Sequence, residues 1–415
     1  MERSKPVGIR IDDGKRQVVN VVTWEQRKLS EFGEATGGTS IESEFSADGI
    51  YKVISIGSYS EDNIYRDQGI RAVRSDKTIN RILNKGDITM ILNDKTASGN
   101  IIGRVLLIEE SGVYVYNQRT ERIEVGSENY NSQFIYTMLN APEIRDKIIK
   151  QSQGNTQIYV NWTTVSQTDY LVPQIEEQIK IGEYFKSIDN LITLHQRKCD
   201  EMKKMKKFML QKMFPKNGQK NPEIRFDGFT DDWEQRKLSE VAEFNPKSEL
   251  PETFEYVDLE SVVGTEMVSH RTETRETAPS RAQRLARTGD VFFQTVRPYQ
   301  RNNYLFEKPD NNYVFSTGYA QMRPKIDAEF LMCFLQTDSF VKVVLDNCTG
   351  TSYPAINSND LSNLEIVLPA SDDEQRRIGS FISNLDNLIT LHQRKCNWLK
   401  KLKEYMLKNI FQRYK

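Results

Sequence analysis

The chain has 415 residues, of which 38% are hydrophobic, and its formal net charge is −1 at pH 7. No apolar run is long enough to cross a membrane, and the length suits about two or three domains. The near-neutral charge argues against a protein that coats nucleic acid indiscriminately, although basic segments follow Arg197 and Arg394. The absence of a signal-peptide core and of any Cys-x-x-Cys pair among the four cysteines favours a cytoplasmic protein.

A repeated motif divides the chain into two half-copies. Residues 1–22 form a leader, with a short strand predicted over residues 18–22, and the motif Trp-Glu-Gln-Arg-Lys-Leu-Ser-Glu then starts at Trp24. The same letters return from Trp233. A repeat of this length indicates an internal duplication, so we expect both halves to share one fold.

Each half continues with a region of short strands and helices, punctuated by Gly, Asn and Asp. The predicted strands lie at residues 51–56, 87–92 and 101–108 in the first half and at 254–259 and 289–293 in the second. The predicted helices lie at residues 133–139, 143–149 and 328–344. The turns at Gly86-Asp87 and Gly289-Asp290 lead into equivalent strands, which indicates a shared mixed α/β fold beneath divergent letters.

Each half ends in a long helix with a coiled-coil period. The eleven residues from Asp189 to Cys199 return unchanged from Asp386 to Cys396. About five heptads surround each copy, which is enough for a two-helix seam, so each helix is expected to pair with the other. The residues expected at this coiled-coil and subunit interface are Ile181, Ile188, Leu191, Ile192, His195, Cys199, Met202, Met209, Ile378, Leu385, Leu388, Ile389, His392, Cys396, Leu399 and Met406.

These patterns predict a fold class and a domain organisation. We expect an α+β protein of two tandem, pseudo-symmetric halves, each a mixed α/β domain followed by a long helix. The expected segments are the leader (1–22), a first domain (23–173), a first long helix (174–214), a linker (215–232), a second domain (233–369) and a second long helix (370–415).

No catalytic or metal-binding motif stands out. The chain lacks a Gly-x-x-x-x-Gly-Lys-Ser/Thr phosphate loop, a His-Glu-x-x-His zinc helix and the cofactor motifs of a methyltransferase. Asp189 with Glu201 and Lys203 resembles a nuclease pattern, but the second copy has Trp398 and Lys400 at the last two positions. We therefore expect no catalytic, cofactor or metal site in this chain.

The histidines of the two long helices share one heptad position. His195 and His392 are compatible with a facing functional pair or with a polar layer that aligns the helices. The second interpretation is favoured, because a polar residue at a core position is a known device for fixing partner and register. His270 stands alone and is expected to be neither a ligand nor a base.

Both divergent regions carry side chains suited to an acidic, patterned partner. Arginine reads guanine edges and phosphates, and Asn and Gln amides read adenine. The two halves share a fold but differ in these side chains, and recognition of a two-part sequence needs such a pair of different surfaces. We therefore expect both regions to contact DNA. The candidate DNA-binding residues are Arg71, Arg74, Asn93, Lys95, Thr96, Ser98, Asn100, Asn155, Gln157, Arg281, Gln283, Arg284, Arg297, Tyr299, Gln300, Arg301, Asn302, Ser352 and Tyr353.

Taken together, the motifs resemble the specificity subunit of type I restriction-modification systems over nearly the whole chain. The similarity rests on the two Trp motifs, the two Gly-Asp turns, the Gly-Thr-Ser-Tyr-Pro-Ala-Ile segment at 350–356 and the helix start at 374–389. The first half departs from it with Gly-Asn-Thr-Gln-Ile-Tyr at 154–159.

The resemblance implies a non-catalytic reader of double-stranded DNA. Each domain would be a target-recognition domain for one half of a bipartite, asymmetric site, and the antiparallel helices would set the spacer and dock the methylation subunits. The implied partners are two methylation and two restriction subunits. S-adenosylmethionine would be held by the former, ATP and Mg by the latter, and no cofactor by this chain.

Two other functions remain open at this point. A non-catalytic coiled-coil scaffold with protein-binding, β-rich heads is compatible with the near-neutral charge, and sequence-specific duplex binding would discriminate against it. A self-sufficient methyltransferase would need a cofactor pocket that the sequence does not show.

Overall fold

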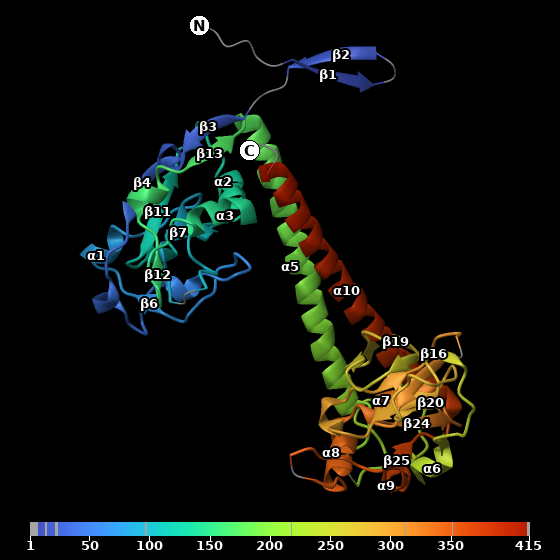
Figure 1. Ribbon diagram of the computed structural model, residues 1–415. Helices are drawn as coiled ribbons and strands as arrows, with labels where there is room; N and C mark the ends of the chain where they lie inside the picture. The colour runs from blue at the N-terminus through green and yellow to red at the C-terminus, as the bar shows by residue number, and fades with distance from the viewer. Residues whose placement is uncertain are drawn as a thin grey trace. The chain divides into compact units, whose positions relative to one another are not determined.

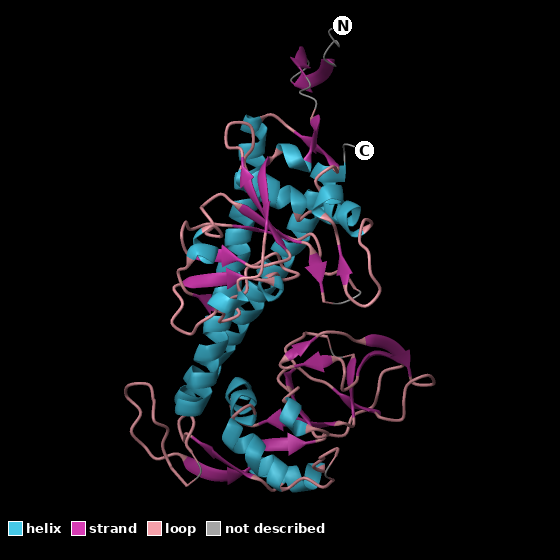
Figure 2. Cartoon of the chain, turned by 90° about the vertical axis from the view of Figure 1, so that its left-hand side faces the viewer, coloured by secondary structure: helices cyan, strands magenta, loops and turns pink. Residues whose placement is uncertain are grey.

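The computed structural model describes residues 7–12, 15–20, 24–95, 98–216, 218–310, 312–350 and 352–412. The chain divides into two units: unit 1 is Met1–Leu194 with Lys395–Lys415, and unit 2 is His195–Arg394. Both mix strands with short helices (Figures 1 and 2). Each also contains part of the long helices α5 (Ile175–Lys212) and α10 (Asp372–Gln412). Among the described residues, no helix has the length and apolar character to span a membrane.

The main sheet of unit 1 is antiparallel and packs against two helices. Its strands, in spatial order, are β4 (Gly33–Gly37), β11 (Thr120–Val125), β7 (Ile88–Ile91) and β9 (Val105–Leu107). The helices are α2 (Ser132–Leu139) and α3 (Pro142–Ile149). Met90 and Ile123 of the sheet share one buried core with Phe134 and Met138 of α2 and Ile148 of α3. This core explains why β7 is apolar at nearly every position.

Smaller elements complete unit 1. A second sheet has the order β10 (Tyr114–Tyr116), β5 (Tyr51–Ile54) and β6 (Arg71–Ala72), with β10 and β5 parallel. The remaining strand pairs are β1 (Val7–Asp12) with β2 (Lys15–Asn20), β3 (Glu25–Lys28) with β13 (Asp169–Val172), and β8 (Asn93–Asp94) with β12 (Ile158–Tyr159). The helical turns are η1 (Leu29–Glu31), η2 (Glu42–Glu44), η3 (Ile56–Ser58), α1 (Asp76–Ile79) and α4 (Trp162–Val165). The strand predicted at 18–22 falls partly in β2, and residues 21–22 lie outside the described residues.

Unit 2 repeats this plan with different letters. Its main sheet has the order β15 (Ala242–Phe244), β24 (Tyr319–Pro324), β21 (Val291–Gln294) and β22 (Tyr304–Leu305). The second sheet has the order β19 (Arg271–Thr274), β16 (Thr253–Val257), β23 (Tyr313–Ser316) and β20 (Ala282–Leu285), with β16 and β23 parallel. The other elements are β14 (Glu234–Lys237) paired with β25 (Glu365–Leu368), β17 (Val262–Val263) paired with β18 (Glu266–Met267), α6 (Leu238–Val241), η4 (Pro298–Gln300) and α9 (Ser358–Ser362).

The single helix predicted over residues 328–344 was wrong. The structure has two helices here, α7 (Ala328–Leu335) and α8 (Asp338–Asp346). Thr337 separates them, because its extended backbone and its side chain, which accepts the N–H of Phe340, make it the N-cap of α8. The pair α7–α8 corresponds to α2–α3 of unit 1.

The Gly-Asp turns have the same geometry in both units. Gly86 and Gly289 have φ of 96° and 92°, a region that favours glycine. Buried Asp87 accepts hydrogen bonds from Arg122 of β11, the nearest at 2.8 Å. Asp290 accepts them from Arg323 of β24, the nearest at 2.9 Å. The duplication therefore preserved a buried ion pair across the main sheet.

A glutamine and a glycine hold the first turns of α2 and α7 against the long helices. Gln178 accepts the N–H of Asn131 and donates to the carbonyl of Pro173. A Cβ at Gly182 would lie 2.9 Å from Asn131 Oδ1, so only glycine lets the helices approach this closely. Gln375 and Gly379 repeat the arrangement, with the Cβ position 2.7 Å from Oδ1 of Asp327, the N-cap of α7.

The two tryptophans of the repeated motif close the cores near the ends of the long helices. In unit 1, Trp24 packs edge-on against Phe411 of α10. In unit 2, Trp233 packs edge-on against Phe214, which follows α5. The core of each unit thus includes an aromatic side chain from the end of the long helix of the other repeat.

The long helices pair in the antiparallel sense, and polar contacts mark the seam. In unit 2, Nδ1 of His195 lies 2.9 Å from Nδ1 of His392, and Lys206 bonds Asp386 at 2.6 Å. In unit 1, Lys403 bonds Asp189 at 2.6 Å. Lys206 and Lys403, which hold equivalent positions in the two long helices, therefore each have a carboxylate of the repeated eleven-residue stretch as partner.

Candidate nucleic-acid interface

Two loops lie side by side at the edge of the main sheet in unit 2. The primary loop, residues 295–303, joins β21 to β22, and the flanking loop, residues 349–350 and 352–356, precedes α9. The N–H of Ile356 donates to the carbonyl of Thr295 at 3.0 Å, and the N–H of Arg297 donates to that of Pro354 at 2.8 Å. We call this pair of loops the loop platform of unit 2.

Unit 1 has a loop platform at the equivalent place. Its primary loop, residues 92–95 and 98–104, joins β7 to β9, and its flanking loop is residues 153–160. The N–H of Val160 donates to the carbonyl of Leu92 at 2.9 Å, and β8 pairs with β12. The flanking loops bend at Gly154 and Gly350, with φ of 100° and 85°. The weakly similar segments after these glycines therefore occupy corresponding positions.

Two exposed aromatic side chains and a half-buried arginine define the platform of unit 2. Tyr299 is 49% exposed and Tyr353 is 69% exposed. The guanidinium of Arg297 lies over the Tyr353 ring, 5.5 Å from its centroid, and joins the two loops. Ser352 is exposed beside them. This surface offers flat rings and a cation, the groups that contact bases and phosphates.

Three other candidates on the same loop bond the protein itself. Gln300 accepts a hydrogen bond from Gln294 at 2.9 Å. Asn302 accepts the N–H of Gly264 at 2.8 Å, and Arg301 donates to Asp338 at 2.6 Å. Arg297 and Arg301 have φ of 52° and 57°, a region that costs energy for residues other than glycine. These bonds hold the loop in that shape.

The platform of unit 1 is richer in amides. Lys95, Ser98, Asn155 and Gln157 are exposed and Asn93 is half-buried. Asn100 donates to Glu61 at 2.9 Å. Thr96 lies outside the described residues. The structure therefore brings candidates from two distant stretches of the chain onto one edge.

The remaining candidates lie on or next to the second sheets and do not belong to the loop platforms. Arg71 of β6 bonds Asp67 at 2.8 Å, and this contact holds the pKa of the carboxyl below its usual range. Arg74 and Arg281 are exposed, and Gln283 donates to the carbonyl of Ser280 at 2.8 Å. Arg284 is half-buried, and its burial lowers its pKa.

The candidate interface residues of the long helices differ in burial. Those buried are Ile188, Cys199, Ile378, Leu385, His392, Cys396 and Leu399. Those half-buried are Ile181, Ile192, His195, Met202, Met209, Ile389 and Met406. Leu191 and Leu388 are 45% and 39% exposed, which leaves them open to a partner.

Sequence reasoning missed Arg145 of α3, which is 9% exposed. One of its terminal nitrogens lies 3.0 Å from the carbonyl oxygens of both Asn100 and Ile102, so it contacts the primary loop of unit 1. Burial lowers its pKa to about 10. No local signal marks this residue, because its partners lie more than 40 positions away in the chain. Within the described ranges, no cluster of three or more His, Cys, Asp or Glu could hold a metal.

Comparison with known proteins gives a consistent result. The family model described as the type I restriction modification DNA specificity domain matches residues 21–204 and again residues 230–401. The type I restriction enzyme MjaVIII specificity subunit of Methanocaldococcus jannaschii is 22% identical over 346 residues, covering 79% of this chain and 78% of that protein. The HindI specificity subunit of Haemophilus influenzae is 28% identical over 140 residues, covering 32% and 30%.

A solved structure shares the fold. The S subunit of a type I restriction-modification system from M. genitalium superposes with a TM-score of 0.64 at 15% identity, covering 95% of this chain and 98% of that one. The expected fold of two tandem α+β halves, each with a long helix, is confirmed. Because the family model matches both halves and most of the chain, this protein belongs to the family of type I restriction modification DNA specificity domains.

Proposed function

We propose that this chain gives a type I restriction-modification complex its DNA specificity, with each unit reading one half of a bipartite, asymmetric site. The observation that carries the proposal is the loop platform, which has the same place in both units but unlike side chains. A shared backbone would present both platforms to a duplex in a similar way. Different side chains would then select different bases.

The chemistry of each platform supports this role. In unit 2, the exposed rings of Tyr299 and Tyr353 and the cation of Arg297 suit contacts with sugars, bases and phosphates. In unit 1, the amides of Asn155 and Gln157 suit adenine edges, and Lys95 suits a phosphate. The net charge of −1 requires such contacts to be local.

The long helices are proposed to dock the partner subunits. Besides the seam, they present exposed apolar side chains, as expected of a surface that binds another protein. These are Leu191, Leu194, Met205, Phe208, Leu388, Leu391, Trp398 and Tyr405. We propose that two methylation subunits, which bring S-adenosylmethionine, bind here and that two restriction subunits, which bring ATP and Mg, complete the complex. The helix length would set the DNA spacer.

The decisive experiment is a methylome. A host without other methylases would express this chain with its cognate methylation subunit, and single-molecule sequencing would map the modified bases. We expect a split motif with methylated adenines that disappears when this chain is omitted. An assembled, soluble complex that leaves no methylation would refute the proposal and favour a protein-binding scaffold.

Platform variants assign the half-sites within the same assay. Asn155→Ala with Gln157→Ala should relax one half of the motif, and Arg297→Gln with Tyr353→Ala should relax only the other. Lys342→Ala is the matched control, because this exposed lysine of α8 pairs with Asp346 and belongs to neither platform. It should leave both halves unchanged.

A further inference from the structure

In each unit an arginine fastens the primary loop of the platform to the adjacent helix pair. We propose that Arg145 and Arg301 are positioning residues that clamp these loops, and that neither is a DNA ligand. The inference rests on the proposed function, because the clamp affects sequence reading only if the platforms read DNA.

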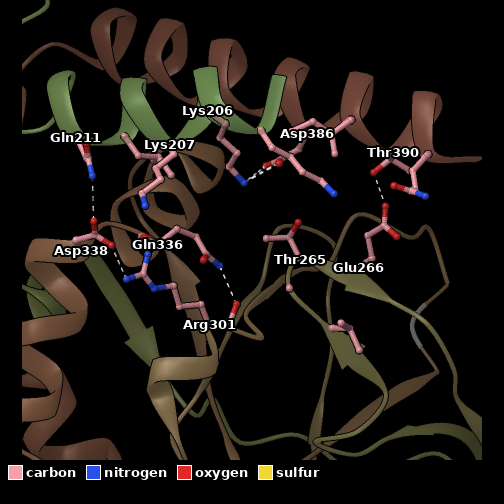
Figure 3. Close-up of a pocket in the computed structure, with 16 residues that line it drawn as sticks. Lys206, Lys207, Gln211, Thr265, Glu266, Arg301, Gln336, Asp338, Asp386 and Thr390 are labelled. Carbon is pink, nitrogen blue, oxygen red and sulfur yellow. Dashed lines mark hydrogen bonds and ion pairs between the residues drawn. The ribbon is translucent and has the colours of Figure 1, made fainter. Parts of the chain in front are cut away.

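In unit 2 the clamp runs from the loop to the helices. Arg301 donates to the carbonyl of Gln336 at 2.9 Å and to the carboxylate of Asp338 at 2.6 Å. Gln336 donates back to the carbonyl of Arg301 at 3.2 Å. Figure 3 shows Asp338 between Arg301 and Gln211 of α5, whose amide donates to it at 3.3 Å. The loop is thereby tied to α5 as well as to α8.

Arg301 and Asp338 form an ion pair within this clamp. Hydrogen bonds from Arg301 and Gln211 hold the pKa of Asp338 below its usual range, so the carboxylate stays ionised at neutral pH. The backbone of Arg301 is left-handed, with a φ of 57°. Such a conformation persists only when neighbouring contacts over-determine it. Releasing the guanidinium would therefore loosen the loop that presents Tyr299.

In unit 1 the clamp runs from the helices to the loop. A terminal nitrogen of Arg145 lies 3.3 Å from the carbonyl oxygen of Gly99, in addition to its contacts with Asn100 and Ile102. These three acceptors lie within residues 99–102 of the primary loop, so one nitrogen of the side chain holds this segment of the loop together. The loop carbonyls satisfy this nitrogen of the buried cation, whereas the Nε of Arg145 is buried without a hydrogen-bond partner.

The two clamps share a position but not a residue. Asn140 and Gln336 are the C-caps of α2 and α7. Asn140 bonds the carbonyl of Val105, which directly follows the primary loop of unit 1, and Gln336 bonds that of Arg301 within the primary loop of unit 2. The arginine then comes from the helix in unit 1 and from the loop in unit 2. The two units thus fix the primary loop to the helix pair with arginines from different elements, which indicates that the loop has to be held in place.

The test uses the full chain assembled with its methylation subunit. Binding to the cognate duplex and to duplexes altered in one half-site is measured over a range of salt. Arg301→Gln and Asp338→Asn should each lower discrimination at the unit 2 half-site about tenfold, as when one base contact is lost. The double variant should be no worse than either single one. Arg145→Met should do the same only at the unit 1 half-site.

The salt dependence separates a clamp from a DNA contact. For a clamp, the slope of log K against log salt stays unchanged. A slope reduced by about one, with equal weakening for every sequence, would make Arg301 a phosphate ligand and overturn the proposal. Unchanged discrimination in all variants would overturn it as well. A wild-type complex that does not discriminate sequences would instead refute the proposed function.

Two further variants guard against simple loss of folding. Arg145→Lys keeps a cation that can reach the carbonyls, and it should recover part of the discrimination lost in Arg145→Met. Arg225→Gln breaks a buried ion pair of unit 2 that does not touch the loop platform. Arg225→Gln should lower the melting temperature yet keep full discrimination between DNA sequences. If this variant also lost discrimination, the losses in the clamp variants would be explained by reduced stability alone.

Discussion

Removal of one buried carboxylate is predicted to destabilise unit 2 selectively. Glu374 has a side chain that is 1% exposed, and Arg225 donates to its two oxygens at 2.6 and 2.8 Å. Glu374→Gln keeps the shape but leaves the guanidinium without its counter-charge. Glu177→Gln is the matched control, because Glu177 holds the same position in the first repeat and accepts a neutral hydrogen bond from Trp24 at 3.2 Å.

The expected magnitudes differ clearly. Breaking a buried ion pair by removing one partner costs about 3–5 kcal/mol. The side chain of Arg225 is 16% exposed, and an amide oxygen still accepts one bond, so we expect about 2–4 kcal/mol for Glu374→Gln. For a unit of this size the melting midpoint should fall by about 4–16 °C. Glu177→Gln retains an acceptor for Trp24 and should cost less than about 1 kcal/mol.

Calorimetry of the full chain would measure these shifts, and hydrogen exchange would locate them. We expect protection to be lost around the start of α10 in the first variant and to be nearly unchanged in the second. Equal, small shifts in both variants would refute the reasoning. So would a loss of protection confined to unit 1.

Three other outcomes follow from the structure. His195→Leu should cost about 1–2 kcal/mol, because Nδ1 of His392 loses this partner, whereas replacing both histidines with leucine should recover the loss; additive losses on thermal denaturation would contradict this. Burial raises the pKa of Glu121 from 4.5 to about 7. The folded protein therefore binds the proton more tightly than the unfolded chain, and its stability falls as the pH rises from 4.5 to about 7. Glu121→Gln should flatten this fall and add up to about 3 kcal/mol at pH 8, and superimposable pH profiles would exclude the effect. Removing one heptad, about 10 Å, from both long helices should shorten the methylated motif by about three base pairs, and an unchanged gap would exclude the spacer role.

The duplication made most of the fold predictable from sequence. Repeated letters indicated which segments correspond, and periodicity indicated the long helices. The Gly-Asp turns marked equivalent strands because a buried aspartate needs the same partner in each copy. The break between α7 and α8 was missed, although the polar run from Gln336 to Ser339 interrupts the apolar residues there. Thr337 reveals its capping role only when its side chain meets the N–H of Phe340.

The site was less predictable than the fold. The sequence placed polar residues on the primary loop of unit 2 but could not separate those that point outward from those that bond the protein. Gln300 and Asn302 have partners on β21 and on the β17–β18 turn, and pairing of that kind depends on tertiary contacts. Arg145 gave no signal, because its importance comes from loop carbonyls that are distant in sequence.

The notch formed by Gln178 and Gly182, and again by Gln375 and Gly379, has an evolutionary consequence. Each notch contacts the capped first turn of a short helix through backbone groups and an Asn or Asp side chain. These contacts do not depend on the other side chains of the recognition domain. A recognition domain could therefore be exchanged by recombination, between repeats or between related genes, without a new contact with the long helix having to evolve. Under the proposed function, such exchange would create new pairs of half-sites while the two long helices stay the same.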